Sequence, residues 1–356
     1  MNHRRSSRSG TPTLRYYDLG LVSFRIDLKV LALAAVATLV LAGLALWALT
    51  LGSYAVPPGQ VIAALRGHAS AQVQFIVIDI RLPRLLSAIL VGAALSMAGA
   101  LVQSLVRNPL VSPDIIGINA GASAATVFWV ISGFAASAIT PVAFVGAICA
   151  ALVVYLLSWR GHIATQRLVL VGIGVNAMLV ALVQLLIVRG RINDVQRIYQ
   201  WMAGSLYAST WSGVRLLSVA IVVLGPLGAA SLSALRILQI GKSTARVVGV
   251  AVEPVRLAVL AVSCALSAVA VSTSGPIVFV ALVVPHLARV LAGAINAGVF
   301  VLCAVLGGIL LLGADMVAQH ALPVTLPAGV VIAALGAPYF LLLLYRSQAQ
   351  IAGAAR

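Results

Sequence analysis

The sequence predicts an all-α polytopic membrane protein with about ten transmembrane helices, and three observations support this prediction. Hydrophobic residues make up 62% of the 356 residues and charged residues only 8%, while the mean hydropathy is +1.12. Water-soluble domains are much less apolar. The apolar residues also form runs of about 20, the length that one helix needs to cross a hydrocarbon core of roughly 30 Å. Lipid offers no partners to backbone N–H and C=O groups, so spanning segments are expected to be helical.

Apolar runs separated by polar breaks define the ten expected spans in chain order. They lie at 28–51, 83–106, 115–133, 138–158, 167–188, 212–234, 254–272, 276–293, 297–319 and 327–345. The transmembrane domain therefore covers 28–346, between a tail at 1–27 and a tail at 347–356. The first tail holds five arginines but no apolar core, so it does not read as a cleaved signal peptide.

Three connections are longer than a tight turn requires. The segments 52–79 and 189–211 are expected on the outer face, and the second contains Trp201, Tyr207 and Trp211, aromatic residues typical of a membrane interface. The segment at about 236–254 is polar enough to leave the membrane on the cytoplasmic side. It is long enough for one or two short helices.

The basic residues predict the orientation. An even number of spans puts both termini on one side, and Lys and Arg favour the cytoplasm. With the termini cytoplasmic, most of the 23 basic residues lie inside, and the outer side holds only Arg66, Arg81, Arg84, Arg189, Arg191, Arg197 and Arg215. The formal charge of +16 is thus spread along membrane-flanking segments rather than gathered on a soluble domain, which argues against a nucleic-acid partner.

Three blocks of sequence follow one another in a fixed order. They are Arg81-Leu82-Pro83-Arg84 leading to Arg107-Asn108-Pro109-Leu110 and Gly117, then Ser274-Gly275-Pro276 leading to Pro285-His286-Leu287-Ala288-Arg289, and Leu326-Pro327-Ala328-Gly329 leading to Gly336-Ala337-Pro338. Together these blocks resemble the iron-siderophore and vitamin B12 permease family of ABC importers, over nearly the whole chain.

The resemblance implies a type II ABC importer permease fold in a bacterial inner membrane. It also implies a dimer with a second permease copy or a paralogue, two ABC ATPase subunits, and a periplasmic or lipoprotein substrate-binding protein. The expected cargo is an iron-siderophore complex. The chain itself is expected to act without enzymatic activity, cofactor or metal.

Arg81 and Arg84 precede the second span on the predicted outer face. Basic residues at helix ends are commonly interfacial anchors. The resemblance favours another role, in which both arginines pair with acidic residues on the two lobes of the binding protein. A twofold permease dimer would present each arginine twice.

The cytoplasmic segment Gly241-Lys242-Ser243-Thr244 imitates the end of a phosphate-binding P-loop. The full motif requires a glycine five residues before Gly241, where Arg236 stands, so ATP hydrolysis is expected in a separate subunit. What the resemblance implies instead is ATPase coupling, through Arg107, Asn108 and Pro109 and through Ser243, Ala245, Arg246 and Gly249. Lys242 departs from the family pattern, in which an acidic residue is usual. An ordinary basic loop is the alternative.

Polar side chains inside the spans are candidates for the translocation pathway. Ser96 and Gln103 share one helical face with Gly92 and Gly99, a pattern that is also typical of close helix packing. Asn176 and Gln184 occupy the fifth span. Polar groups within a membrane usually face protein or water, so pathway lining and packing remain open for these four side chains.

Four further residues bear on the function. His286 has no neighbouring ligand set, which favours a structural hydrogen bond over metal binding. Asp315 is the only carboxylate well inside a late span and is therefore a functional candidate. Gln319 stands where the family often has Arg, and Thr325 stands where an acid is common. Both differences from the family remove charge from the outer face. Electrostatic docking of the binding protein is therefore expected to depend more on Arg81 and Arg84.

The sequence leaves alternative functions open. A cobalamin or haem importer belongs to the same family. An ion-coupled secondary transporter generally needs intramembrane carboxylates, of which Asp315 is the main candidate among seven acidic residues. An intramembrane hydrolase would use Ser272, Ser274 and His286, but the serines and the histidine are predicted near opposite membrane faces.

Overall fold

The structure is a computed structural model that describes residues 14–18, 23–160, 165–321 and 323–354. Within these residues the predicted all-α membrane fold is confirmed, because each expected span coincides with a helix. Eight helices in the described part of the chain are long and apolar enough to cross a membrane. They are α1 (Leu28–Thr50), α4 (Leu82–Val106), α6 (Ile139–Ser158), α7 (Thr165–Val188), α9 (Trp211–Ile240), α11 (Val252–Ser274), α13 (Ala297–His320) and α14 (Ala328–Ala354). Two shorter apolar helices are α5 (Ile118–Ile131) and α12 (Val280–Ala292).

The long connections are largely helical as well. The segment after α1 holds α2 (Pro58–Leu65) and α3 (Ala71–Gln74), and a π-helical stretch, η1 (Phe75–Arg81), carries α3 without a break into α4. The other short elements are η2 (Pro113–Ile116), η3 (Ala136–Ala138), α8 (Ile192–Met202) and α10 (Lys242–Val247). In the segment predicted for short cytoplasmic helices, α9 takes the first part and α10 follows it.

Both predicted tails contain regular structure. β1 (Leu14–Asp18) and β2 (Ser23–Asp27) pair as an antiparallel hairpin that leads directly into α1. The carboxylate of Asp27 accepts a hydrogen bond from the backbone N–H of Lys29 at 2.9 Å, so it caps the first turn of α1. Residues 1–13 and 19–22 of the predicted tail lie outside the described residues. At the other end α14 continues to Ala354, because no proline interrupts the chain after Pro338.

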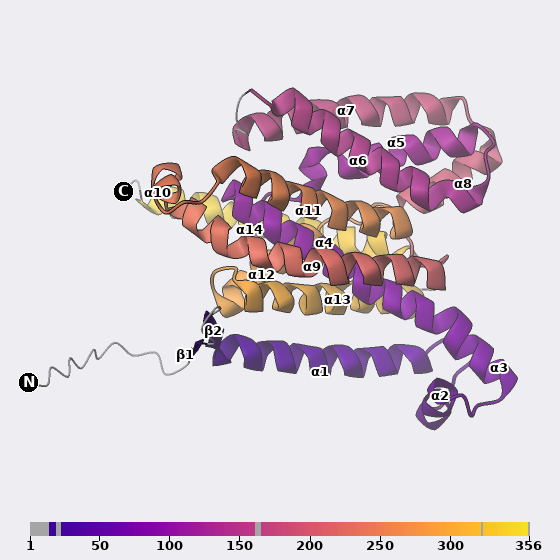
Figure 1. Cartoon of the computed structure of the whole chain (residues 1–356). Helices are drawn as coiled ribbons and strands as arrows, with labels where there is room; N and C mark the ends of the chain where they lie inside the picture. Colours follow the sequence, from indigo (N-terminus) through magenta and orange to yellow (C-terminus); the bar gives the residue numbers. More distant parts are fainter. Residues whose placement is uncertain (1–13, 19–22, 161–164, 322, 355–356) are drawn as a thin grey trace, which may run out of the picture.

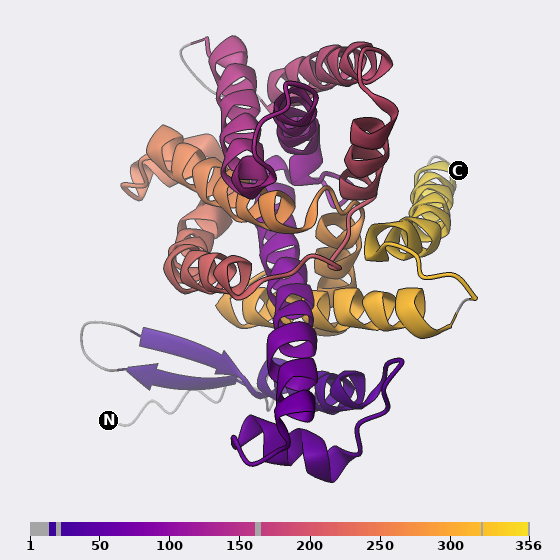
Figure 2. The same ribbon diagram turned by 90° about the vertical axis from the view of Figure 1, so that its right-hand side faces the viewer.

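α4 is the central helix of the molecule. Figure 2 shows it running through the middle of the bundle, and α13, α11, α9 and α12 are its main neighbours. Its apolar window is 83% buried, against 17% for α7. Gly92 faces the backbone of Gly307, and Gly99 faces the backbone of Ala281, with no room for a Cβ at either position. Small residues let helix backbones approach in lipid, so packing is what these two glycines provide.

The bundle has two ends, named here by their residues. β1, β2, α10 and the last turns of α14 lie at one end (left in Figure 1), together with Arg107 at the C-terminus of α4. This is called the Arg107 end. α2, α3 and α8 lie at the opposite end (Figure 1), with Arg84 in the first turn of α4. This is called the Arg84 end.

Candidate functional site

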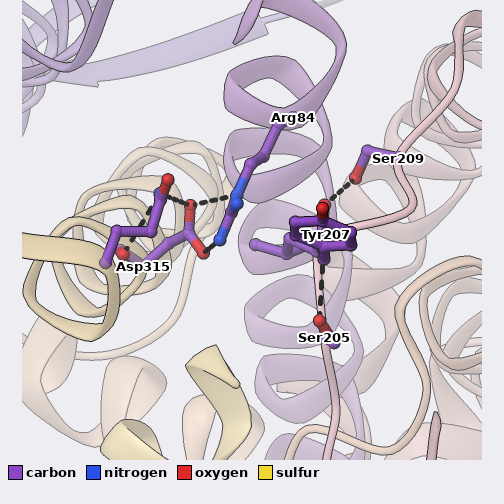
Figure 3. A network of polar contacts seen from close by, with 7 residues as sticks. Arg84, Ser205, Tyr207, Ser209 and Asp315 are labelled. Atoms are coloured by element: carbon purple, nitrogen blue, oxygen red, sulfur yellow. Dashed lines mark hydrogen bonds and ion pairs between the residues drawn. The ribbon is translucent and has the colours of Figure 1, made fainter. Parts of the chain in front are cut away.

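An ion pair at the Arg84 end joins α4 to α13. The Nε and Nη2 atoms of Arg84 donate to the two carboxylate oxygens of Asp315 at 3.0 and 2.8 Å, as Figure 3 shows. The Asp315 side chain is only 3% exposed, while that of Arg84 is 20% exposed. A bidentate Arg–carboxylate pair is directional as well as strong. It therefore fixes the orientation of the Arg84 guanidinium relative to the bundle.

Two further side chains complete this cluster. The Nε2 atom of Gln319 donates to Asp315 Oδ2 at 2.7 Å, so the carboxylate accepts hydrogen bonds from two residues. The ring of Tyr207 lies 6.0 Å from the Arg84 guanidinium carbon, the outer limit of a cation–π contact. Tyr207 comes from the segment between α8 and α9, which Figure 3 places across α4 from Asp315. Three separate parts of the chain thus meet at Arg84.

Arg81 is held by backbone groups. Its Nη1 donates to the carbonyl of Leu49 at 2.7 Å and its Nη2 to the carbonyl of Tyr54 at 2.5 Å. Gly52 lies against this guanidinium, and a Cβ there would collide with it. A cavity of about 330 Å³ lies beside both predicted docking arginines, between α1, the start of α4 and α13. Arg81 and Arg84 therefore meet at one cavity, each with an internal partner.

At the Arg107 end, the predicted coupling residues Arg107, Asn108 and Pro109 border a second cavity of about 320 Å³. Arg107 ends α4 in the left-handed conformation, with φ of 58°. Its Nη2 donates to the carbonyl of Leu238 in α9. The Oδ1 atom of Asn108 accepts from the backbone N–H of Leu110 at 2.9 Å and so closes the turn that follows α4.

The other predicted coupling residues form a compact helical unit. Ala245 in α10 is fully buried, whereas Arg246 and Gly249 are exposed. Gly249 takes a positive φ of 84°, and the N–H of Val250 returns to the carbonyl of Ala245 at 2.9 Å. This is the usual way a helix ends at glycine. Ser243 is helical, and its side chain lies outside the described residues.

The predicted pathway residues fall into two groups. Ser96 is completely buried and donates to the carbonyl of Cys303 in α13 at 2.7 Å. Gln103 is also buried and donates to the carbonyls of Ala281 and Leu282 at 3.2 and 3.1 Å. Within the single chain these two side chains join helices, and Gln103 also borders the second cavity.

Asn176 and Gln184 lie on α7, at the edge of the bundle. Asn176 is partly exposed and Gln184 is exposed. The structure does not bring this pair together with Ser96 and Gln103, which belong to the central helix. A pathway that involves α7 would need a second molecule to cover its exposed face.

The sequence singled out Asp315 without identifying its partner. One signal was present, since Arg84 lies near the start of α4 and Asp315 near the end of α13, so an antiparallel pair of helices puts both at the same depth. Gln319, one helical turn after Asp315, was noted only as a missing charge. His286 packs edge-on against Tyr339, with ring centroids 6.2 Å apart. Among the described residues, no three His, Cys, Asp or Glu side chains gather as metal ligands.

Known proteins are similar to this chain in sequence. The model of the FecCD transport family matches residues 37–346. Ferric enterobactin transport system permease protein FepG of Escherichia coli (strain K12) is 42% identical over 320 residues, 89% of this chain and 96% of the relative. Hemin transport system permease protein HmuU of Yersinia pestis is 36% identical over 286 residues, 78% of this chain and 85% of the relative.

A solved structure agrees with the fold. A chain from an inward-facing conformation of a metal-chelate type ABC transporter matches with a TM-score of 0.81 and 28% sequence identity. The match covers 88% of this chain and 99% of the solved chain. Arg84, Asp315, Arg107 and Arg289 lie within the residues that the family model matches.

Proposed function

Because the chain belongs to the FecCD transport family, we propose that it is the permease subunit of an ABC importer that carries an iron-siderophore complex across the bacterial inner membrane. The observation that carries this proposal is its similarity, along most of both chains, to a ferric enterobactin permease. The similarity to a hemin permease makes haem the second candidate cargo. Cobalamin stays a third candidate within the family.

The proposed mechanism couples two surfaces of one bundle. The Arg84 end faces the periplasm and receives the binding protein, while the Arg107 end faces the cytoplasm. There α10 docks on an ABC ATPase subunit, with Arg246 exposed and Ala245 anchoring the helix to the bundle. A second permease copy or a paralogue covers α7, and the pathway runs along Asn176 and Gln184 between the two permeases. ATP hydrolysis in the partner alternately opens the two ends.

Arg84 is suited to binding-protein docking because its orientation is already fixed. A guanidinium has five N–H donors, and the bonds to Asp315 use only Nε and Nη2. Nη1 stays available to a carboxylate of the binding protein. Arg81 lies nearly one helical turn before Arg84 and supplies a second positive charge. Preorganised charges lower the ordering cost of association.

Uptake measurements test the transport proposal. A strain that lacks this chain should lose uptake of radiolabelled ferric enterobactin and regain it when the chain is supplied, with no change in hemin uptake. Rescue of hemin uptake alone would identify haem, and not a siderophore complex, as the cargo. Uptake by energised membrane vesicles without ATP would contradict the ABC mechanism and favour an ion-coupled transporter.

A charge swap tests docking separately. Arg84→Glu leaves two acids in contact, so the informative variant is the swap Arg84→Glu/Asp315→Arg, which keeps the ion pair but moves the positive charge. We expect this variant to fold normally and to bind the binding protein at least about tenfold more weakly, as loss of one interfacial charge pair predicts. Arg66→Glu is the matched control at the same end. Normal association of the swap variant with the binding protein would show that Arg84 is not part of the docking surface.

A further inference from the structure

The cavity at the Arg107 end is lined by two arginines and by polar side chains, a composition suited to ligand binding. It opens between the last turns of α4, α9 and α12, and is lined by Gln103, Ser104 and Arg107 from α4, Gln239 from α9 and Arg289 from α12. Its volume of about 320 Å³ lies at the small end of the range for ligand pockets, about 300 to 1,000 Å³.

Two guanidinium groups face this cavity with neutral partners only. Nη2 of Arg289 donates to Oε1 of Gln103, and Nη2 of Arg107 donates to the backbone carbonyl of Leu238. Among the described residues, neither arginine forms an ion pair. Two like charges around one partly dry cavity repel each other, and each guanidinium keeps unused donors. The cavity is therefore suited to an anion with several acceptor oxygens.

The surroundings of the cavity indicate the source of this anion. Gln103 and Ser104 lie within the last turn of α4, so the cavity reaches about 5 Å into the helical segment. The other two helices that border the cavity also carry exposed apolar side chains there, since Val290 follows Arg289 on α12 and Ile240 follows Gln239 on α9. A phosphate that carries acyl chains satisfies both features. An acidic side chain from a water-soluble subunit would satisfy the two arginines but not these exposed apolar side chains.

We propose that this cavity binds the phosphate of an anionic phospholipid, with Arg107 and Arg289 as its charge partners. The acyl chains pack along the exposed apolar residues of α12 and the end of α9. Basic pockets between transmembrane helices are known to hold anionic headgroups, and the guanidinium fork matches phosphate oxygens. The proposal requires only that the chain lie in a membrane, and it does not depend on which substrate is carried.

Native mass spectrometry of the full-length permease tests the site. The protein is titrated with phosphatidylglycerol and with phosphatidylcholine of the same acyl chains. We expect preferential retention of phosphatidylglycerol, and about tenfold or greater weakening in Arg107→Gln/Arg289→Gln because two charge-assisted contacts are lost. The control Arg160→Gln/Arg236→Gln removes two exposed charges outside the cavity and should retain the lipid. Arg107→Lys/Arg289→Lys should keep part of the affinity.

The possible results separate the competing explanations. Equal retention of both lipids by the wild type, or equal loss in the cavity and control variants, overturns the proposal. Complete displacement of phosphatidylglycerol by inorganic phosphate would identify a free-anion site instead. Unchanged lipid retention in Arg107→Gln/Arg289→Gln, together with loss of the ATPase subunit from the purified complex, would assign the arginines to that subunit.

Discussion

The two ends of α4 handle positive charge differently. At one end Arg84 is neutralised inside the chain by Asp315, whose side chain is 3% exposed. At the other end Arg107 and Arg289 are oriented by a carbonyl and an amide oxygen, which carry no net charge. The same helix thus begins beside one arginine that has a counter-charge, Arg84, and one that has only carbonyl partners, Arg81, and it ends beside two arginines with neutral partners only.

This difference predicts on which cluster the stability of the fold depends more. A buried carboxylate without its cation is costly, so the Arg84–Asp315 pair is part of what holds α4 against α13. The arginines at the Arg107 end lack such a partner among the described residues, and their charge remains available to something outside the chain. Loss of one charge from the Arg84–Asp315 pair should lower the stability of the fold strongly. The arginines at the Arg107 end should matter less for stability and more for binding of a partner outside the chain.

The largest effect is expected from breaking the internal pair. Asp315→Asn keeps the shape of the side chain but leaves Arg84 without a counter-charge, which should lower the free energy of unfolding by about 3 kcal/mol. Adding Arg84→Gln should recover much of that loss, because no unpaired charge remains. Thermal unfolding in detergent measures both. Asp194→Asn, on the partly exposed face of α8, is the control, and an equal loss in the control would contradict the special role of Asp315.

A smaller effect is expected from the neutral partner at the other end. Gln103→Ala removes the acceptor of Arg289 and the donor to the carbonyls of Ala281 and Leu282. Because water can enter the adjacent cavity and replace part of these bonds, we expect a loss of about 1 to 2 kcal/mol. Gln184→Ala, on the exposed face of α7, should change stability very little. A loss for Gln103→Ala above that for Asp315→Asn would reverse the comparison.

Sequence reasoning predicted the fold well because lipid restricts the choices. Each of the ten apolar runs became a helix, and the predicted family and fold class are confirmed. The ends hold more regular structure than the sequence indicated. Leu14–Asp27 was expected as part of a tail and contains a hairpin. Phe24 and Ile26 alternate with polar residues in β2, the period of a strand, but a five-residue alternation beside long apolar runs is a weak signal.

The candidate site was only partly predictable. Arg84, Asp315 and Gln319 were each noted, but their contact spans more than 200 residues of sequence, and periodicity does not report which helices are neighbours. Ser96 and Gln103 were recognised as polar groups on the face of α4 that carries Gly92 and Gly99. That face packs on α13 and α12, and periodicity alone does not identify these neighbouring helices.

The smallest expected effect concerns Asp114, a carboxyl group in the segment that follows Arg107. Asp114 in η2 makes no ion pair among the described residues, and burial raises its pKa to about 6, with a hydrogen bond from Ser112 at 3.3 Å opposing the shift. A carboxyl whose pKa is higher in the folded state binds more protons there. Stability should therefore fall as the pH rises from about 4 to about 6 and then level off.

Asp114→Asn should abolish this slope. Because the side chain of Asp114 is partly exposed, we expect the variant to gain only about 1 kcal/mol over the wild type at pH 8, with no gain near pH 4. Unfolding temperatures at the two pH values measure the difference, and Asp194→Asn should retain the wild-type slope. A slope that survives in Asp114→Asn would place the titrating group elsewhere. Loss of the slope would show that the two ends of α4 differ in their acidic groups as well, because Asp315 has a cation beside it and Asp114 has only a hydroxyl group.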